Sequence, residues 1–256
     1  MIKITQDINF ENYTLILPSI AVGNVGQLSV DLLISNLNLQ RIGQVFSTAF
    51  VPIVGANAYE EHSKQPITAI DIYAGIKERL IVIQIRSPYV NSLTQFFTEL
   101  KQFIIQKKIA KVIILASSYD YEKREIVLQH LKLRYIASPD IHSKNGKLFH
   151  TLKWIEHKPK DIPGTSRKEN LHIPGGGFAR SIFDYLSNAN IPCAVLFKFC
   201  SEGDNITDAI ALIYYLNQWI QVLESNSDNS NNDTTHLKYP PSWKHLFGKP
   251  LQHDIY

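Results

Sequence analysis

Glu202 and Asp204 are the only closely spaced carboxylates that the sequence places on an expected strand-to-helix loop. Paired carboxylates can serve as acid and base when their surroundings separate their pKa values. Asp204 or Asn205 is equally well placed to cap the helix, with Asp208 in the first turn facing the positive end of the helix dipole. Helix-start preferences favour capping over catalysis.

Two glycine-rich turns could hold an anion. Gly23, Asn24 and Gly26 follow an expected strand and open a helix, where backbone amides can bind phosphate. The turn lacks the third glycine of a dinucleotide fingerprint and the Lys-Ser/Thr of a P-loop, so a tight turn with Asn24 as cap is favoured. The second turn permits positive φ and close backbone approach, which favours backbone packing at a partner surface over a ligand cradle. Its glycines are Gly175, Gly176 and Gly177.

Other catalytic signatures are missing from the sequence. The nine histidines are dispersed without an HExxH motif, two cysteines cannot make a structural zinc site, and no GxSxG elbow occurs. The sequence therefore places no nucleophile beside a base, and we expect no enzyme, no cofactor and no metal.

The elements that must position these residues alternate between strand and helix periods. Expected strands cover Tyr13–Pro18, Ile42–Ser47, Ile67–Tyr73, Leu80–Arg86, Lys111–Ala116 and Ala194–Phe199. Expected helices cover Asn24–Leu39, Leu93–Lys108 and Ile206–Leu223. This alternation predicts an α/β layered sandwich, with a largely parallel central sheet flanked by helices.

The composition predicts one domain with an appended tail. At 256 residues, 45% of them hydrophobic, the chain can bury one substantial core, which we assign to residues 1–223. Residues 224–236 are rich in Ser, Asn and Asp and are expected to form a flexible linker. Residues 237–256 regain apolar character, so we expect Pro240–Gly248 to dock on the domain and the last residues to hang free.

Charge and cysteine content narrow the function classes. A net charge of +3 is too small for the whole chain to attract nucleic acid or anionic lipid. The local excess of basic residues from Lys144 to Asn170 is typical of a solvated, mobile insert. No apolar run is long enough to cross a membrane. Cys193 and Cys200 lie seven positions apart in one expected strand, too far to pair, and read as buried thiols of a cytosolic or nuclear protein.

Four segments carry a resemblance to a known family. They are LPSIAVGNVGQLSVDLLISNLNLQRIG from Leu17, the loop IPGGGFARSIFDYL from Ile173, IPCAVLFKFCSEGDNITDAIALIYYLNQWIQVL from Ile191, and PPSWKHLFG from Pro240. Between about Leu15 and Gly248 the chain resembles the proteasome assembly chaperones.

The resemblance implies a non-enzymatic chaperone with an α/β sandwich fold. Such a chaperone would pair with proteasome assembly chaperone 1, bind proteasome α subunits, promote α-ring formation of the 20S core and prevent premature α-ring dimerisation. Similar layering occurs in nucleoside phosphorylases, so a small-molecule enzyme of nucleoside phosphorylase-like fold stays the alternative.

The resemblance also implies where partners bind. Ile255 and Tyr256 match the first two positions of the hydrophobic-Tyr-any tail that such chaperones insert between α subunits, while the third position has no counterpart. The glycine turns and the loop of Glu202 and Asp204 are expected near a partner contact, because open α/β sheets bind at strand-to-helix loops.

Overall fold

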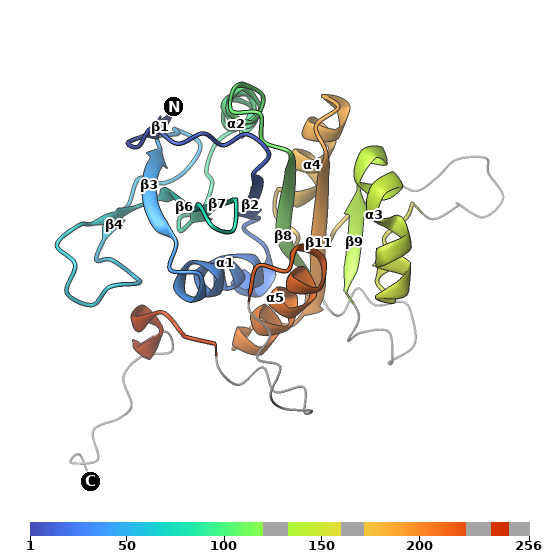
Figure 1. Ribbon diagram of the computed structural model, residues 1–256. Coiled ribbons are helices and arrows are strands. Elements are labelled where there is room, and N and C mark those ends of the chain that lie inside the picture. The colour runs from blue at the N-terminus through green and yellow to red at the C-terminus, as the bar shows by residue number, and fades with distance from the viewer. Residues whose placement is uncertain (120–132, 160–171, 224–236, 246–256) are drawn as a thin grey trace, which may run out of the picture.

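The computed structural model describes residues 1–119, 133–159, 172–223 and 237–245 (Figure 1). Its centre is a nine-stranded sheet in the order β1-β3-β6-β7-β2-β8-β11-β9-β10. The strands are β1 (Ile2–Ile4), β3 (Gln40–Val45), β6 (Ile70–Gly75), β7 (Leu80–Ile85), β2 (Thr14–Pro18), β8 (Lys111–Tyr119), β11 (Cys193–Cys200), β9 (Arg134–Ala137) and β10 (Ile155–Glu156). A separate two-stranded sheet pairs β4 (Val54–Gly55) with β5 (Ile67–Thr68).

The centre of the large sheet is parallel. Strands β7, β2, β8 and β11 run in one direction, so their carboxyl ends meet at a single edge, called the carboxyl edge below. Every residue of β7 is buried, as expected for a strand covered on both faces. Antiparallel strands flank this centre: β1, β3 and β6 on one side and β9 on the other.

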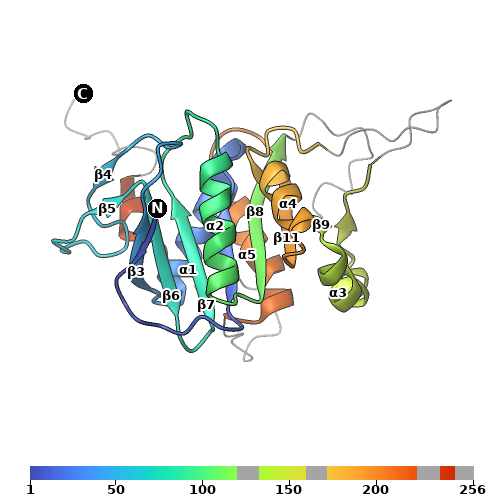
Figure 2. The same ribbon diagram turned by 90° about the horizontal axis from the view of Figure 1, so that it is seen from above.

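Helices cover both faces of the sheet, which confirms the predicted α/β fold (Figure 2). On one face α2 (Thr94–Gln106) and α4 (Ala179–Asn188) bury Phe96, Leu100 and Ile182 in a first core cluster. On the other face α1 (Val25–Asn36) and α5 (Ile206–Ile220) form a second cluster with β8 and β11. The topological likeness to nucleoside phosphorylases stays a prediction.

Two local expectations are wrong. Asn24 occupies the N-cap position of α1, but its backbone is left-handed (φ 53°) and its side chain makes no capping hydrogen bond. Asparagine tolerates that conformation, so its contribution is to the turn and not to a side-chain cap. The segment IPGGGFARSIFDYL is not all loop, since its second half opens α4, in which Ile182, Phe183 and Leu186 face the core.

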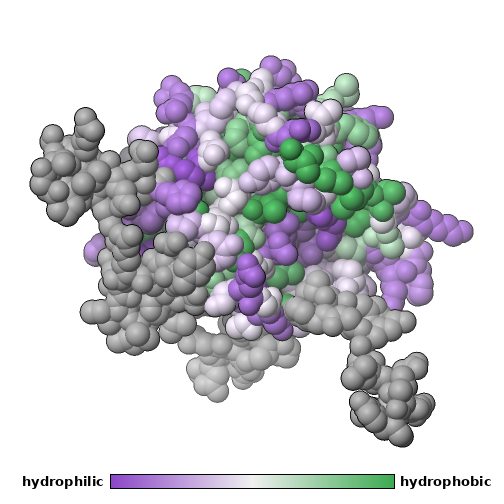
Figure 3. All heavy atoms as spheres, turned by 180° about the vertical axis from the view of Figure 1, so that it is seen from behind, coloured by the Kyte–Doolittle hydropathy of each residue, from purple (hydrophilic) through white to green (hydrophobic). Residues whose placement is uncertain are grey.

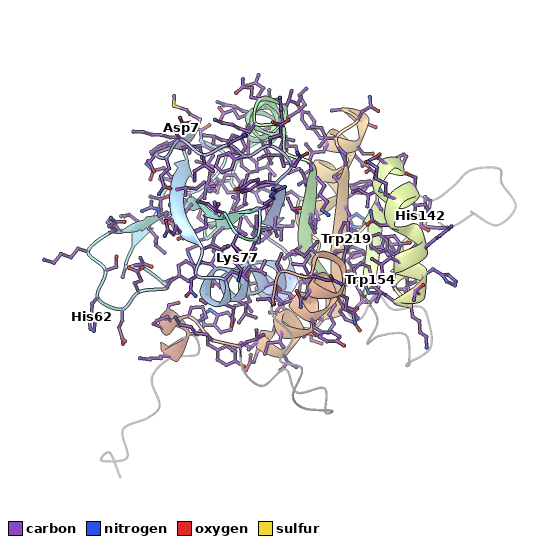
Figure 4. The ribbon with its side chains drawn as sticks, in the orientation of Figure 1. Asp7, His62, Lys77, His142, Trp154 and Trp219 are labelled. Carbon is purple, nitrogen blue, oxygen red and sulfur yellow. The ribbon has the colours of Figure 1, made fainter. Side chains whose placement is uncertain are left out.

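The basic region after Lys144 is also not a mobile insert in its described part. Residues 144–151 belong to α3 (Pro139–Thr151), and β10 follows. The Phe149 and Trp154 rings stack at 4.8 Å between centroids, and the Trp219 Nε1 donates to the Asn145 Oδ1 at 2.9 Å (Figure 4). Aromatic packing between α3 and α5 therefore orders this segment despite its excess of basic residues. Residues 160–170 lie outside the described residues.

The two cysteines are free and buried at opposite ends of β11, as predicted. Among the described residues, no helix combines the length and the apolar character that crossing a membrane requires. Whether residues 1–223, 224–236 and 237–256 behave as domain, linker and tail stays a prediction.

Candidate partner-binding surface

Three of the loops singled out by the sequence meet at the carboxyl edge. The Val22 amide donates to the Gly175 carbonyl at 2.8 Å, so the loop after β2 is joined to the glycine loop before α4. The Ser19 hydroxyl donates to the Gly176 carbonyl at 2.7 Å, and the Ser117 hydroxyl of β8 donates to the Val22 carbonyl at 2.5 Å. The structure thus brings the two glycine turns together, as strand order at this edge requires.

The first glycine turn is packed against the start of α5. Gly23 has φ 65°, and a β-carbon there would lie 2.4 Å from the Asn205 Nδ2. At Gly26 a β-carbon would lie 2.4 Å from the Leu115 carbonyl oxygen of β8. Glycine is needed at both positions because α1 must approach β8 and α5 this closely.

The second glycine turn is closed in the same way. Gly177 has φ 59°, and a β-carbon there would lie 2.0 Å from the Ile20 carbonyl oxygen. At Gly175, with φ 72°, it would lie 2.7 Å from the Tyr119 ring. Side chains and backbone of the chain itself fill the space beside both turns, so these glycines serve close packing and not an anion cradle.

Glu202 and Asp204 lie exposed on the loop between β11 and α5. The Asp204 Oδ1 accepts a hydrogen bond from the Ile206 amide at 3.0 Å, at the start of α5. Asp208, in the first turn, pairs instead with the buried Lys198 ammonium at 3.0 Å. Asp204 therefore closes a local turn before α5, on the same edge as the glycine turns. Asn205 occupies the N-cap position without a side-chain capping hydrogen bond, so the predicted side-chain cap is wrong.

A feature that sequence reasoning missed lies beside these loops. Five hydrophobic side chains remain exposed around the ends of β3 and β7, and we call them the apolar patch. They are Phe46, Ile53, Val54, Tyr89 and Val90, with Val54 72% and Val90 61% exposed. On the face seen from behind in Figure 3, hydrophobic side chains gather among polar ones. Contiguous exposed hydrophobic surface of this kind marks interaction sites.

Backbone pairing holds the patch together. Phe50 and Tyr89 form an antiparallel bridge, and the Val90 amide donates to the Ala49 carbonyl at 2.8 Å. The Tyr89 ring meets the buried Phe178 ring edge-on, with centroids 6.0 Å apart. Because Phe178 directly follows Gly177, the patch is continuous with the glycine turns. The sequence signal that could have indicated the patch is the presence of apolar residues in proline-containing loops that lack helix or strand periodicity.

A buried carboxylate holds the residue from which the Tyr89 and Val90 loop begins. Asp31 of α1 is almost fully buried and accepts hydrogen bonds from the Tyr59 hydroxyl and the Arg86 guanidinium, each at 2.6 Å. Burial, and then the nearby Asp31 carboxylate, raise the pKa of Tyr59 well above its ordinary value of 10.0. Arg86 precedes the loop that carries Tyr89 and Val90, so the ion pair fixes where that loop begins.

Other possible sites are weaker. Within the described ranges, no group of three or more His, Cys, Asp or Glu side chains could hold a metal. An open hollow of about 410 Å³ is lined by residues 7–11, before β2, and residues 106–108, at the end of α2, at the sheet edge opposite the glycine turns. Ile255 and Tyr256 lie outside the described residues.

Comparison with known proteins gives consistent matches. A family model described as the PAC2 family matches residues 15–231. The chain is 37% identical to proteasome assembly chaperone 2 of Mus musculus over 246 residues, covering 94% of this chain and 93% of that protein. It is 36% identical to proteasome assembly chaperone 2 of Homo sapiens, covering 93% of each. The resemblance found in the sequence is confirmed.

Solved structures agree at the level of the fold. Pyrococcus furiosus PbaA, an archaeal homolog of proteasome-assembly chaperone, superposes with a TM-score of 0.64 at 17% identity, covering 89% of each chain. Pyrococcus furiosus PbaB, an archaeal proteasome activator, gives 0.60 at 14% identity, covering 88% of this chain and 90% of that one.

Proposed function

Because the chain belongs to the PAC2 family, we propose that it is a non-enzymatic chaperone of proteasome assembly. Together with proteasome assembly chaperone 1 it forms a heterodimer that binds proteasome α subunits, promotes α-ring formation of the 20S core and prevents premature α-ring dimerisation. The observation that carries this proposal is similarity over nearly the whole chain to relatives named proteasome assembly chaperone 2.

The apolar patch is the surface that we assign to the second chaperone. Its exposed side chains lie on loops fixed by backbone pairing, so binding requires little ordering of the chain. Within the described residues, β4 pairs with β5 alone, and its free edge leaves backbone N–H and C=O groups available for pairing with another chain. The proposed partner surface also includes the loops that carry Gly23, Asn24, Gly26, Gly175, Gly176, Gly177, Glu202 and Asp204. Gly26 and Gly176 are buried, so they would shape these loops without touching a partner.

We assign the binding of α subunits to the C-terminal end of the chain. Ile255 and Tyr256 offer an aliphatic and an aromatic side chain, a combination that suits a preformed pocket on a partner. Deleting both residues should weaken binding to α subunits while leaving the heterodimer intact. Unchanged affinity for α subunits would remove them from the binding surface.

A small-molecule enzyme is the competing function. The chain itself occupies the space beside the glycine turns, which favours the chaperone. A thermal-shift screen with nucleosides and phosphate separates the two, because a bound ligand would raise the midpoint of unfolding by mass action. We expect no shift, and a ligand-dependent rise would favour the enzyme.

Native mass spectrometry of the N-terminally tagged chain, purified gently from its own cells, tests the proposal. We expect a second chaperone of similar size together with proteasome α subunits. Recovery of the bare chain or of a homo-oligomer would contradict it. Localisation in cytoplasm and nucleus belongs to the same proposal, and imaging of the tagged chain checks it.

A further inference from the structure

The hairpin of β4 and β5 is too small to be stable alone. Each of its strands has two residues, Val54–Gly55 and Ile67–Thr68, and neither strand belongs to the large sheet. A two-stranded hairpin needs packing against another element to hold its shape. Because Val54 is part of the apolar patch, the contacts that fix this hairpin also decide how part of the patch is presented.

The β5 end of the hairpin is held by the large sheet. The Thr68 amide donates to the Asp71 Oδ2 at 2.9 Å, and the Thr68 hydroxyl donates to the Asp71 Oδ1 at the same distance. The Arg41 guanidinium donates to the Pro66 carbonyl at 2.8 Å. Asp71 lies on β6 and Arg41 on β3, so β5 is attached to the domain independently of the loop that joins it to β4.

The loop between β4 and β5 is held by a segment distant in the sequence. The Ser242 amide donates to the Ala58 carbonyl of this loop at 3.2 Å. Ser242 belongs to the short helix η4 (Pro241–His245), drawn in red near β4 in Figures 1 and 2. We call residues 237–245 the C-terminal anchor.

The anchor is itself attached to α1. Asn36, the last residue of α1, accepts from the Lys238 amide at 2.8 Å and donates to the Lys238 carbonyl at 3.0 Å. Lys244 of the anchor also pairs with Glu61 of the loop at 3.1 Å, but both side chains are more than half exposed, and such pairs contribute little. The attachment between anchor and loop therefore depends on buried contacts.

Trp243 makes the buried contact. Its ring lies in the second core cluster, and its Nε1 donates to the Asp31 Oδ2 at 3.2 Å. The Asp31 Oδ1 accepts from the Tyr59 hydroxyl at 2.6 Å, and Tyr59 follows Ala58 in the loop. Anchor and loop thus meet at one buried carboxylate of α1, where hydrogen bonds are stronger than those between neutral groups.

We propose that Trp243 is a positioning residue that fixes the β4–β5 loop against α1 and thereby holds Val54 in the arrangement that the second chaperone binds. The role in partner binding rests on the proposed function, which assigns the apolar patch to that chaperone. Without the Trp243 indole, the loop loses one side of its packing and β4 can separate from β5. The β5 end stays in place, because Asp71 and Arg41 hold it.

Hydrogen exchange on the full chain tests the fixing of the loop. In Trp243→Ala the amides of Tyr59 and Ser242 should exchange at least about tenfold faster, because the opening is local. The Thr68 amide and those of β8 should keep their protection. Lys244→Ala is the matched control, since Lys244 contacts the same loop at the surface, and it should behave as the unmodified chain.

Trp243→Phe keeps an aromatic ring and removes only the indole N–H, so it provides a second variant that preserves most of the packing. It should speed exchange at Tyr59 less than Trp243→Ala does. Unchanged exchange at Tyr59 in both variants would overturn the inference. Equal acceleration at Tyr59, Thr68 and β8 would also overturn it, because Trp243 would then stabilise the whole fold and not the loop.

Calorimetry with the recombinant second chaperone tests the presentation of the patch. Affinity is measured for the unmodified chain, Trp243→Ala, Val54→Ser and both changes together. We expect Trp243→Ala to weaken binding about tenfold, the loss produced when the hairpin adopts the binding arrangement about a tenth of the time. The loss should be smaller in the Val54→Ser background, because the side chain that Trp243 positions is then missing.

Two outcomes of this cycle would overturn the positioning role. They are an equal loss in both backgrounds and an affinity that Trp243→Ala leaves unchanged. If the unmodified chain did not bind the second chaperone, the proposed function and the presentation of the patch would both fail. Hydrogen exchange would still decide whether Trp243 fixes the loop.

Discussion

The glycine turns and the apolar patch lie side by side on the carboxyl edge, yet they use their residues in opposite ways. At Gly23 and Gly177 the chain packs so closely that a β-carbon would overlap a neighbouring atom. At Val54 and Val90 most of the side chain remains exposed to solvent. The residues whose types suggested binding are engaged in folding, and the surface available to a partner is the hydrophobic one beside them.

Among these substitutions, Gly177→Ala should destabilise the closely packed glycine turns most. The substitution forces a β-carbon against the Ile20 carbonyl at positive φ, and should lower the free energy of unfolding by about 3 kcal/mol. Denaturant titration measures the loss. Gly55→Ala is the matched control, because nothing lies within 4 Å of its added carbon, and a comparable loss there would contradict the explanation.

Asp31→Asn tests the ion pair at the start of the patch loop. It leaves Arg86 mostly buried without its counter-charge, which should cost about 2 kcal/mol of unfolding free energy. Hydrogen exchange should also increase at the Val90 amide, in the patch loop that follows Arg86. A loss of stability without faster exchange in that loop would separate the patch from the buried carboxylate.

The same buried cluster predicts a pH dependence. The pKa of Tyr59 is raised in the folded state. The contribution of Tyr59 to the free energy of unfolding is therefore fully present below the unfolded-state pKa of about 10, and it is lost as the pH rises toward the folded-state pKa. Stability should fall above pH 10 by about 1.4 kcal/mol per pH unit for this group. Urea titrations from pH 9 to 11 measure the slope, which should be shallower in Tyr59→Phe, and an identical slope would exclude Tyr59 as its source.

Replacing both Tyr89 and Val90 by Ser tests the patch directly. Val90 is mostly exposed and Tyr89 is half exposed with its ring against Phe178, so the free energy of unfolding should fall by no more than about 2 kcal/mol, while affinity for the second chaperone should fall at least about tenfold. Calorimetry of the purified pair measures the affinity. The matched control is Ile105→Ser, an exposed residue of α2 outside the patch, and equal weakening by the control would contradict the assignment.

Charge reversal of Glu202 and Asp204 should have the smallest effect. Both side chains are exposed, and the hydrogen bond that Asp204 accepts from the Ile206 amide closes only a local turn, so the free energy of unfolding should change by about 0.5 kcal/mol or less. A change in binding to the second chaperone would extend the contact surface to this loop. Intact binding would confine it to the apolar patch.

The elements with strong periodicity were predictable. The observed ends of α1, α2 and α5 and of the central strands lie within a few residues of their expected positions, because burial on one face repeats along the sequence. Elements at the flank, such as β9 and α3, were missed. These elements are stabilised by contacts with aromatic residues distant in the sequence, such as Trp219, and local hydrophobic periodicity does not predict such contacts.

By itself the sequence determined the α/β class, the family and the positions at which the backbone needs glycine, because periodicity, long similar segments and positive-φ turns are local properties. Tertiary structure alone decided what those glycines pack against, which hydrophobic side chains stay exposed, and that Trp243 meets Asp31 across the domain. Exposure and long-range contacts depend on which strands become neighbours. That arrangement emerges only when the whole sheet has formed.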